Sequence, residues 1–343
     1  MNRPLSSDDL LHVLDHTRDL WEELRGNRIF ITGATGFIGT WLRESFAYAN
    51  DRLGLGAAAV CLTRDPAASR LREPHLAARD DIALVRGDVR DFAAPAGAFS
   101  HVIHAATASG VAIPPLEMLD TIVVGTRRTL DFAVNGKAKK FLLISSGAVY
   151  GRQPPDMTHV PETFLGAPDM RAPGSAYGEG KRVAELLCEV YRREYGIETT
   201  VARCFAFVGP HLPLDAHFAV GNFIRDGLAG REIRVKGDGM TNRSYLYAAD
   251  LVIWLWTILM QGRPGDVYNA GSEQDISIGE LAKLVADAFQ PTPLVIVERA
   301  QTLDQLHERY VPATLKAQAE LGLVQKIDLP TAIRKTVAWH RTV

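Results

Sequence analysis

Tyr177 and Lys181 stand four residues apart in a segment with a helical pattern. This spacing places a phenol and an ammonium on one helix face, one turn apart. A positive charge beside a phenol favours the phenolate, so we expect the pKa of Tyr177 to lie below its reference value of about 10. Such a tyrosine takes or returns a hydroxyl proton while a nicotinamide takes or returns a hydride. Ser146, which closes a predicted strand, can hydrogen-bond the reacting oxygen. We therefore predict Ser146, Tyr177 and Lys181 as the catalytic residues.

A glycine-spaced turn follows the first predicted strand of the chain, at residues 33–39. Gly33 permits a tight turn, Gly36 lets the backbone approach a pyrophosphate, and Gly39 lets the following helix lie close to the strand. The N-terminus of that helix offers unpaired N–H groups to the phosphates. The position after a strand makes this motif specific for a dinucleotide. Further predicted cofactor contacts in and beyond this turn are Thr35, Phe37, Ile38, Tyr177 and Lys181.

Two later segments fit the same dinucleotide. Asp88 and Val89 follow the third predicted strand, where the Asp88 carboxylate can accept a hydrogen bond from an adenine amino group. The alternative for Asp88 is a turn or helix-capping role. Ala105 and Ala106 follow the fourth strand, where small side chains leave room for the cofactor.

The end of the second strand bears on the choice between NAD and NADP. An acidic residue there binds the ribose 2′-hydroxyl of NAD, but Thr63 occupies the expected position. Arg64 can instead pair with a 2′-phosphate, which slightly favours NADP. Asp65 serves the ribose if the strand ends later, and a solvated Arg64 is the remaining alternative.

The elements that must position these residues alternate between short apolar strands and helices. Strands that are apolar throughout are typical of a parallel sheet buried on both faces. The fold class predicted is α/β: a Rossmann-type doubly wound parallel sheet with a smaller, mixed α/β C-terminal domain. The expected strands are Arg28–Thr32, Ala58–Thr63, Ile82–Arg86, His101–His104, Phe141–Ser145 and Thr199–Arg203, with helical patterns at Met118–Val134 and Ala176–Tyr195.

The predicted domain boundaries follow from this pattern. Residues 1–27 form a helical extension that starts near Ser7, ends at Gly26, and packs on the next domain or on a partner subunit. Residues 28–205 form the dinucleotide-binding domain, to which 246–270 return. Residues 206–245 and 271–343 form the substrate-binding domain.

Composition excludes several classes of protein. The 343 residues suggest about two domains. A formal charge of −2 lacks the basic surplus of a nucleic-acid binder. The longest apolar run, Leu251–Met260, is about half of what a membrane helix needs. Three cysteines without metal-like spacing suggest a reducing compartment, and no site for a metal is expected. Residues 1–27 show no secretory signal, so we predict a cytoplasmic protein.

Together the motifs resemble the extended short-chain dehydrogenase/reductase family, in its NAD(P)-dependent nucleotide-sugar epimerase/dehydratase branch. The resemblance covers about residues 28–341 and implies a nucleotide diphospho-sugar substrate, with Arg243 and Arg309 on the diphosphate and Asn222 near the nucleotide. Ser146 and Tyr177 would also contact the substrate. The family usually forms homodimers through the helices near Met118–Val134 and Ala176–Tyr195. The matching residues are Thr32–Gly39, Ser145–Gly151, Tyr177–Lys181, Arg203, Gly209–Pro210, Gly237–Gly239, Arg243 and Tyr245–Asp250.

Several positions depart from the family pattern and narrow the reaction. The 4,6-dehydratases carry Asp-Glu where this chain has Gly147 and Ala148, so elimination lacks its acid and base. Ala206 and Ile122 each replace an asparagine that is common in the family. We expect an epimerase that works at a sugar carbinol, in the first place C4. The alternative is an NADPH-dependent reductase of 4-keto-6-deoxysugars, followed by a 4,6-dehydratase or a non-catalytic NADP-binding sensor.

Overall fold

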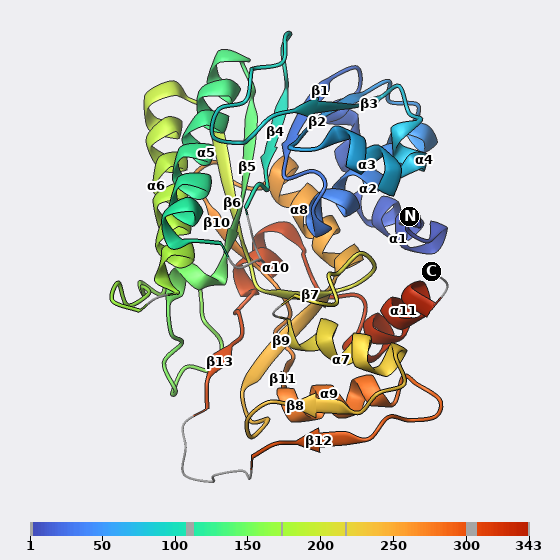
Figure 1. Cartoon of the computed structure of the whole chain (residues 1–343). Helices are drawn as coiled ribbons and strands as arrows, with labels where there is room; N and C mark the ends of the chain where they lie inside the picture. The colour runs from blue at the N-terminus through green and yellow to red at the C-terminus, as the bar shows by residue number, and fades with distance from the viewer. Residues whose placement is uncertain (1–2, 108–112, 173, 217, 300–306, 342–343) are drawn as a thin grey trace.

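A seven-stranded parallel sheet forms the centre of the computed structural model (Figure 1), which describes residues 3–107, 113–172, 174–216, 218–299 and 307–341. The strand order is β10-β6-β5-β4-β1-β2-β3, and every neighbouring pair is parallel. This confirms the predicted fold class. The strands are β1 (Arg28–Thr32), β2 (Ala58–Thr63), β3 (Ile82–Arg86), β4 (His101–His104), β5 (Lys140–Ser146), β6 (Glu198–Cys204) and β10 (Val267–Ala270).

Helices cover both faces of this sheet. On one face, α5 (Pro115–Asn135) and α6 (Ser175–Tyr195) lie side by side over a cluster of buried phenylalanines, of which Phe30 and Phe141 are on strands and Phe132 is on α5. On the other face lie α2 (Phe37–Leu53) and α8 (Ala248–Gln261). In α8, all residues from Ala248 to Met260 are buried. The apolar run at Leu251–Met260 is thus a core helix, because the sheet and the helices around it cover it on all sides. Two short helices, α3 (Pro66–Arg72) and α4 (Pro74–Ala77), join β2 to β3.

The smaller domain lies beyond the carboxyl ends of the strands, where β6 leads into β7 (Figure 1). Its main sheet is built on β9 (Asn242–Tyr247), which pairs in parallel with β7 (Ala206–Val208) and β13 (Arg309–Tyr310) and antiparallel with β11 (Asp275–Ser277). A second pair joins β8 (Ile233–Val235) to β12 (Val295–Val297). The helices of this part are α7 (Ala219–Leu228), α9 (Ile278–Ala286), α10 (Leu315–Leu321) and α11 (Leu329–Arg341).

The N-terminal extension packs on the chain's own sheet domain. Helix α1 (Ser7–Thr17) contacts α8 and α2, and the 3₁₀ helix η1 (Arg18–Leu24) follows it. Ser6, one residue before the expected start, caps α1 by accepting a 3.1 Å hydrogen bond from the backbone N–H of Asp9. The helix also ends earlier than expected. Trp21 then packs against Trp256 of α8, with ring centres 4.6 Å apart, which holds η1 on the core.

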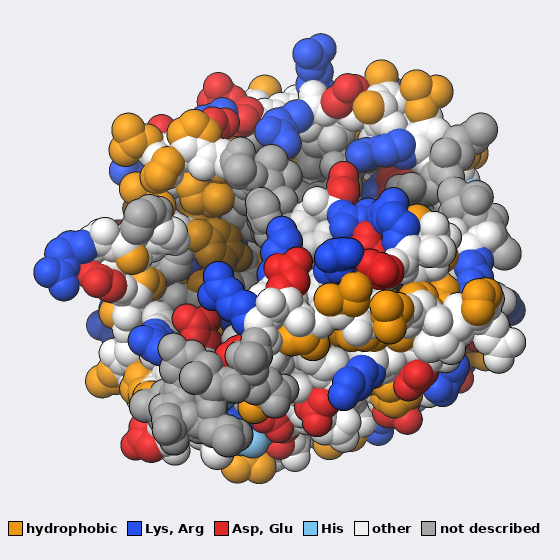
Figure 2. Space-filling model, turned by 60° about the horizontal axis from the view of Figure 1, so that its bottom comes forward, with side chains coloured by type: hydrophobic (Ala, Val, Ile, Leu, Met, Phe, Trp, Pro, Cys, Tyr) orange, Lys and Arg blue, Asp and Glu red, His pale blue; other side chains and the backbone are white. Residues whose placement is uncertain are grey.

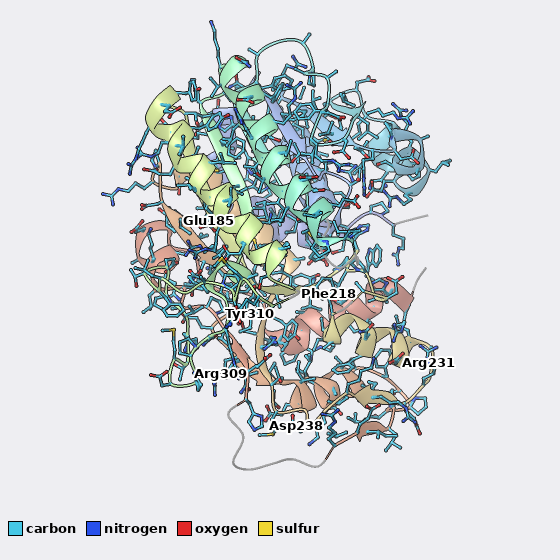
Figure 3. All side chains as sticks on the ribbon, turned by 60° about the vertical axis from the view of Figure 1, so that its left-hand side comes forward. Glu185, Phe218, Arg231, Asp238, Arg309 and Tyr310 are labelled. Carbon is cyan, nitrogen blue, oxygen red and sulfur yellow. The ribbon has the colours of Figure 1, made fainter. Side chains whose placement is uncertain are left out.

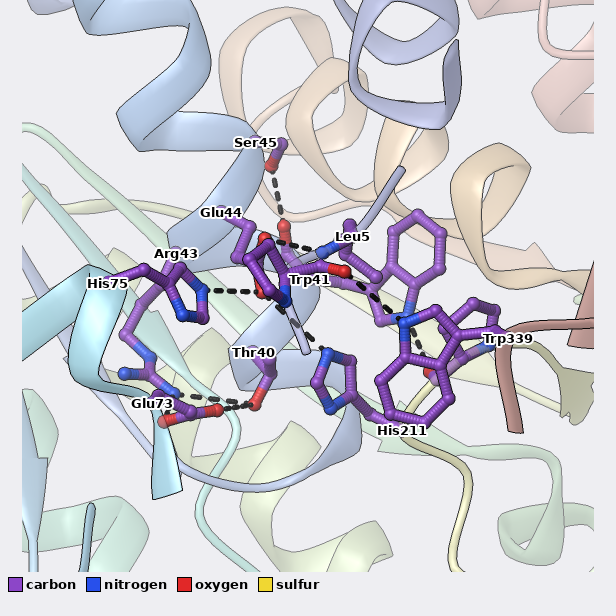
Figure 4. Close-up of polar contacts among 12 residues, drawn as sticks. Leu5, Thr40, Trp41, Arg43, Glu44, Ser45, Glu73, His75, His211 and Trp339 are labelled. Carbon is purple, nitrogen blue, oxygen red and sulfur yellow. Dashed lines mark hydrogen bonds and ion pairs between the residues drawn. The ribbon is translucent and has the colours of Figure 1, made fainter. Parts of the chain in front are cut away.

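Helix α2 follows the glycine turn, and a buried polar network holds it in place (Figure 4). Arg43 and Glu73 form a 2.7 Å ion pair with only 1% and 3% of their side chains exposed. Arg43 Nε also donates a 2.7 Å hydrogen bond to the carbonyl oxygen of Ala34 within the glycine turn. The guanidinium therefore ties the turn to both α2 and Glu73. On the next residue of α2, the Glu44 carboxylate accepts hydrogen bonds from the backbone of Leu5 and from His75.

The surface mixes charges of both signs. On the face shown in Figure 2, Lys and Arg side chains lie close to Asp and Glu side chains, as the near-neutral composition leads one to expect. Within the described residues, every helix is too short or too polar to cross a membrane. Cys61, Cys188 and Cys204 are all buried and none takes part in a disulfide.

Candidate active site

The glycine turn has the geometry that close backbone packing requires. Gly33 has a φ of +65°, and a Cβ there would lie 2.5 Å from the backbone of Ala105. A Cβ at Gly39 would lie 2.3 Å from the carbonyl oxygen of Gly33. At Gly36 the same added atom would meet only the Gly33 oxygen, at an ordinary 3.5 Å. Gly33 and Gly39 therefore serve internal packing, whereas Gly36 borders open space.

The N-terminus of α2 opens onto that space. Gly36 is the N-cap residue, and no side chain caps the helix there. The first N–H groups of a helix have no partner within the helix, so those of Phe37 and Ile38 remain available as donors. Uncapped donors, the positive end of the helix dipole and a position without Cβ together suit a pyrophosphate. These residues fit a dinucleotide cofactor.

On the adenosine side of the predicted cofactor site, Asp88 and Asp65 both have partners within the protein. The Asp88 carboxylate accepts hydrogen bonds from the backbone N–H of Arg90 at 3.0 Å and from its guanidinium at 2.8 and 2.9 Å. This is the turn role considered as its alternative, and the adenine contact stays a prediction. Asp65 caps α3 by accepting from the backbone N–H of Ala68 at 2.9 Å. Arg64 is exposed, and its charge helps to lower the pKa of Asp88. Thr35 and Thr63 place their hydroxyl oxygens 3.4 Å apart.

The end of β4 supports the glycine turn from the side. Ala106 donates its backbone N–H to the hydroxyl of Thr32 at 3.2 Å. His104 lies buried between the hydroxyls of Thr32 and Thr126, at 2.8 and 3.0 Å. Burial lowers the pKa of His104 to about 3, and the positive charge of Lys181 adds to this effect. The imidazole is therefore neutral and holds strand and helix together.

Ser146, Tyr177 and Lys181 converge at the carboxyl end of β5. Ser146 is the last residue of β5 and caps the 3₁₀ helix η2 (Gly147–Tyr150) by accepting from the backbone N–H of Ala148 at 3.2 Å. Tyr177 lies in the first turn of α6, with its phenol close to the Ser146 side chain. Lys181 lies one turn further and is 1% exposed. Its Nζ donates a 2.7 Å hydrogen bond to the carbonyl oxygen of Ile144 and lies 5.9 Å from the centre of the Tyr177 ring.

The protonation states differ from the sequence-based expectation. Burial raises the pKa of Tyr177, and the neighbouring Ser146 hydroxyl offsets only part of this effect. Burial also lowers the pKa of Lys181 to about 8. The predicted lowering of the Tyr177 pKa is thus wrong for the protein alone, because desolvation of the phenol is the largest effect on this group. The ammonium of Lys181 donates its hydrogen bond to Ile144. Tyr177 is a neutral hydrogen-bond donor in this state.

Sequence reasoning missed Tyr310, whose hydroxyl lies 3.5 Å from the Ser146 hydroxyl. Its ring packs on Phe205 with ring centres 4.6 Å apart, and its hydroxyl points to the backbone oxygen of Cys204 at 3.4 Å. A Cβ at Gly147 would lie 2.8 Å from this hydroxyl and 2.7 Å from the Phe205 ring. The glycine at residue 147 was a signal in the sequence that another group fills this space. Tyr310 reaches that space because β13 pairs with β9, and no local sequence pattern indicates this pairing.

The two arginines predicted to bind a diphosphate lie on opposite faces of the small sheet. In the β9–β13 register Arg309 stands beside Asn242, and Tyr310 beside Arg243. Because successive side chains of a strand point to opposite faces, Arg243 shares a face with Tyr310, and its guanidinium lies 5.7 Å from that ring. Arg309 instead forms a 2.6 Å ion pair with Asp275. Figure 3 shows Arg309 further from α6 than Tyr310. The structure does not bring the two arginines together.

Two other residues of the predicted motifs have structural partners. Asn222, in α7, accepts a 3.0 Å hydrogen bond from Arg225 through its side-chain oxygen. Arg203 forms a 2.6 Å ion pair with Glu185, which lies one turn beyond Lys181 on α6. Glu185 also accepts a hydrogen bond from Ser145, next to Ser146. Sequence reasoning missed Glu185, although its spacing from Lys181 placed it on the same helix face.

The geometry is that of a nicotinamide-dependent enzyme, and comparison with known proteins agrees. The model of the NAD dependent epimerase/dehydratase family matches residues 29–271. The chain belongs to this family. This confirms the resemblance stated from the motifs, and with it an enzyme of the NAD-dependent epimerase/dehydratase type. The expectation of NAD or NADP as cofactor is confirmed at the level of the family.

Curated relatives of this epimerase/dehydratase include UDP-glucuronic acid decarboxylases. The decarboxylase 1 of Arabidopsis thaliana is 30% identical over 317 residues, which cover 92% of this chain and 70% of the relative. That of Xenopus tropicalis is 29% identical over 317 residues, with 92% and 72% covered.

Solved structures share the fold of this epimerase/dehydratase. UDP-glucose 4-epimerase of Thermotoga maritima, solved with UDP-glucose, has a TM-score of 0.74 and 23% identity, over 92% of this chain and 99% of the other. UDP-glucuronic acid 4-epimerase of Bacillus cereus, solved with UDP-glucuronic acid and NAD, has a TM-score of 0.76 and 20% identity, over 92% and 99%.

Proposed function

We propose that this chain binds a nucleotide diphospho-sugar and transfers a hydride at one sugar carbinol, with Ser146, Tyr177 and Lys181 handling the proton. The observation that carries this proposal is the convergence of Ser146 and Tyr177 at the carboxyl end of β5, above the anchored Lys181. In open α/β sheets, ligands bind outside this end of the strands. The bound dinucleotide supplies the hydride acceptor and donor, and in its oxidised form a positive charge.

Each residue has a distinct part in moving the proton. In the reducing direction, the carbonyl carbon receives the hydride. Neutral Tyr177 donates its phenolic proton to the carbonyl oxygen. In the oxidising direction, the Tyr177 phenolate takes the hydroxyl proton back. Ser146 donates a hydrogen bond to the same oxygen and stabilises its developing charge. Lys181 adds positive charge beneath the tyrosine while it is protonated, at pH values below about 8.

The lack of acidic side chains at residues 147 and 148 favours epimerisation over elimination. Removing water from a sugar requires a base for a carbon-bound proton and an acid for the leaving hydroxyl. Gly147 and Ala148 supply neither group. A C4 epimerase needs only the oxidation and the return of the same hydride to the opposite face of the ketone. Ser146, Tyr177 and Lys181 suffice for both steps.

Decarboxylation of a UDP-uronic acid is the second candidate, which the similarity to UDP-glucuronic acid decarboxylases favours. Oxidation at C4 makes the carboxylate at C5 that of a β-keto acid. Loss of CO₂ breaks the carbon–carbon bond and leaves the electron pair on C5, conjugated with the ketone, so no base is needed to remove a carbon-bound proton. C5 then takes up one proton from solvent in place of the CO₂, and the hydride removed in the oxidation returns to C4. A site without the acidic pair can therefore support this reaction.

The mass of the product distinguishes the candidates. The purified protein is incubated with UDP-glucose or UDP-glucuronic acid and NAD. The nucleotide sugars are then separated by chromatography, and their masses are measured by mass spectrometry. An epimerase gives an isomer of unchanged mass, a decarboxylase a product lighter by CO₂, and a dehydratase one lighter by water. A reductase instead consumes NADPH only when a 4-keto-6-deoxysugar nucleotide is present. No conversion of any of these compounds would refute the proposal.

We also propose a homodimer formed through α5 and α6. These helices pack against each other on one face of the sheet and leave apolar side chains in solvent. Val124 of α5 and Leu186 of α6 are 44% and 62% exposed. Light scattering should give twice the chain mass, and Leu186→Glu should shift the particle toward one chain. A monomeric wild-type protein at micromolar concentration would contradict the proposal.

A further inference from the structure

A second phenol stands beside the catalytic tyrosine, and the catalytic scheme above does not use it. Tyr310 comes from β13 of the smaller domain, whereas Ser146 and Tyr177 come from the sheet domain. Its hydroxyl nevertheless lies 3.5 Å from that of Ser146. Tyr310 is thus the point where the smaller domain reaches the reacting centre.

The hydroxyl of Tyr310 has no strong partner within the described residues. Hydrogen bonds between hydroxyl groups and oxygen are usually 2.5–3.0 Å long. The two contacts of Tyr310, to Ser146 at 3.5 Å and to the backbone oxygen of Cys204 at 3.4 Å, both exceed this range. The side chain is half-buried, so a substrate oxygen can reach its hydroxyl and accept a shorter hydrogen bond.

The spacing of the hydroxyls suits one shared oxygen atom. An oxygen about 2.8 Å from both Ser146 and Tyr310 fits between hydroxyls 3.5 Å apart. The phenol of Tyr177 lies close to the same Ser146 hydroxyl. The ring of Tyr310 is held by Phe205 on one side, and Gly147 leaves room for its hydroxyl. The donor is therefore oriented before a substrate binds.

We propose that Tyr310 is a further catalytic residue, whose hydroxyl donates a hydrogen bond to the reacting sugar oxygen together with Ser146. The inference rests on the proposed function, because it assigns a new contact to the same carbinol oxygen. Burial raises the pKa of Tyr310, and a negative charge on Tyr177 raises it further. Tyr310 thus stays protonated when Tyr177 gives up its proton. It acts as a permanent donor, and Tyr177 alone exchanges the proton.

Tyr310→Phe removes the hydroxyl and keeps the ring against Phe205. The matched control is Tyr268→Phe, which removes a buried hydroxyl that donates to Glu320 at 2.9 Å. Tyr268 lies on β10, which carries none of Ser146, Tyr177 and Tyr310. With whichever of UDP-glucose and UDP-glucuronic acid the wild type converts, we expect Tyr310→Phe to lower kcat about 10–100-fold with a smaller change in KM. Tyr268→Phe should stay within about twofold of the wild type. Equal kcat in wild type and Tyr310→Phe would overturn the proposal.

A binding experiment tests the contact without turnover. The dissociation constants of UDP-glucose and of its 4-deoxy analogue are measured by calorimetry on wild type and Tyr310→Phe, with NAD present. We expect the substitution to weaken UDP-glucose several-fold and to leave the 4-deoxy analogue unchanged, because the analogue lacks the accepting oxygen. Equal weakening of both compounds would refute a contact to that oxygen. If the wild type binds neither compound nor UDP-glucuronic acid, the proposed function itself fails.

Discussion

The ammonium of Lys181 donates a 2.7 Å hydrogen bond to the carbonyl oxygen of Ile144. Ile144 lies two residues before Ser146 on β5, so one strand holds both the lysine and the serine. Helix α6 carries Tyr177 and Lys181 together. The relative placement of Ser146, Tyr177 and Lys181 is therefore set by the packing of α6 on β5.

Burial of Lys181 makes the stability of the protein depend on pH. Its pKa is about 8 in the folded protein and about 10.5 when unfolded, so between these values the unfolded chain binds more protons. Stability from this group therefore rises with pH across that window. Lys181→Met removes the buried charge and should be more stable than the wild type below pH 8. Urea unfolding should show this advantage shrinking by on the order of 3 kcal/mol by pH 10.5. A difference that does not change with pH would contradict the assignment.

Tyr177→Phe tests proton transfer. We expect kcat to fall by about 10²–10⁴-fold, because general acid–base catalysis contributes that much, while the affinity for NAD changes little. Tyr195→Phe on the same helix is the control, since its ring is exposed to solvent. Steady-state kinetics and fluorescence titration with NADH provide the two readouts. Turnover that survives in Tyr177→Phe would exclude this tyrosine as the proton carrier.

Alanine at two positions of the glycine turn should separate cofactor binding from folding. Gly36→Ala adds a methyl group that meets one protein atom at 3.5 Å, so stability should be unchanged while the affinity for NAD falls about tenfold. Gly39→Ala places the same group 2.3 Å from the Gly33 oxygen and should cost about 1–3 kcal/mol of stability. Denaturant unfolding and cofactor titration distinguish the two. If Gly36→Ala binds NAD as the wild type does, the pyrophosphate does not approach there.

The charge of Arg64 should govern the choice of cofactor. Arg64→Ala removes an exposed guanidinium at the end of β2, and we expect it to weaken NADP binding several-fold without weakening NAD. The control is Arg72→Ala, which removes an exposed arginine at the end of α3. The ratio of the two dissociation constants is the quantity to compare. An unchanged ratio in Arg64→Ala would mean that this side chain is merely solvated.

The buried Arg43–Glu73 pair should contribute to stability and to the shape of the glycine turn. Arg43→Met leaves the Glu73 carboxylate buried without its partner, which typically costs about 3–5 kcal/mol. It also removes the hydrogen bond to Ala34, so NAD affinity should fall as well. The double variant Arg43→Met/Glu73→Met should recover much of the stability and none of the affinity. Equal losses in both variants would exclude an unpaired charge as the cause.

The sequence predicted the sheet domain more closely than the site within it. Apolar runs bounded by turns gave β1–β4 with their observed ends, and β5 and β6 are each one residue longer at both ends. Local spacing also placed Tyr177 and Lys181 one turn apart on a helix, as observed in α6. It failed for the pKa of Tyr177, because desolvation depends on what the fold places around the phenol. Tyr310 escaped notice because a two-residue strand reaches the site only through pairing with distant β9.

The contact between Gly147 and Tyr310 also predicts how related sequences diverge. Any side chain at residue 147 needs the space that the Tyr310 hydroxyl and the Phe205 ring now fill. Relatives that carry an acidic residue at the position of Gly147 should therefore carry a smaller residue at the position of Tyr310, or have the strand there displaced. The two sites should covary across the family although they lie in different domains. A sequence alignment could then separate branches that eliminate water from branches that leave the sugar skeleton intact.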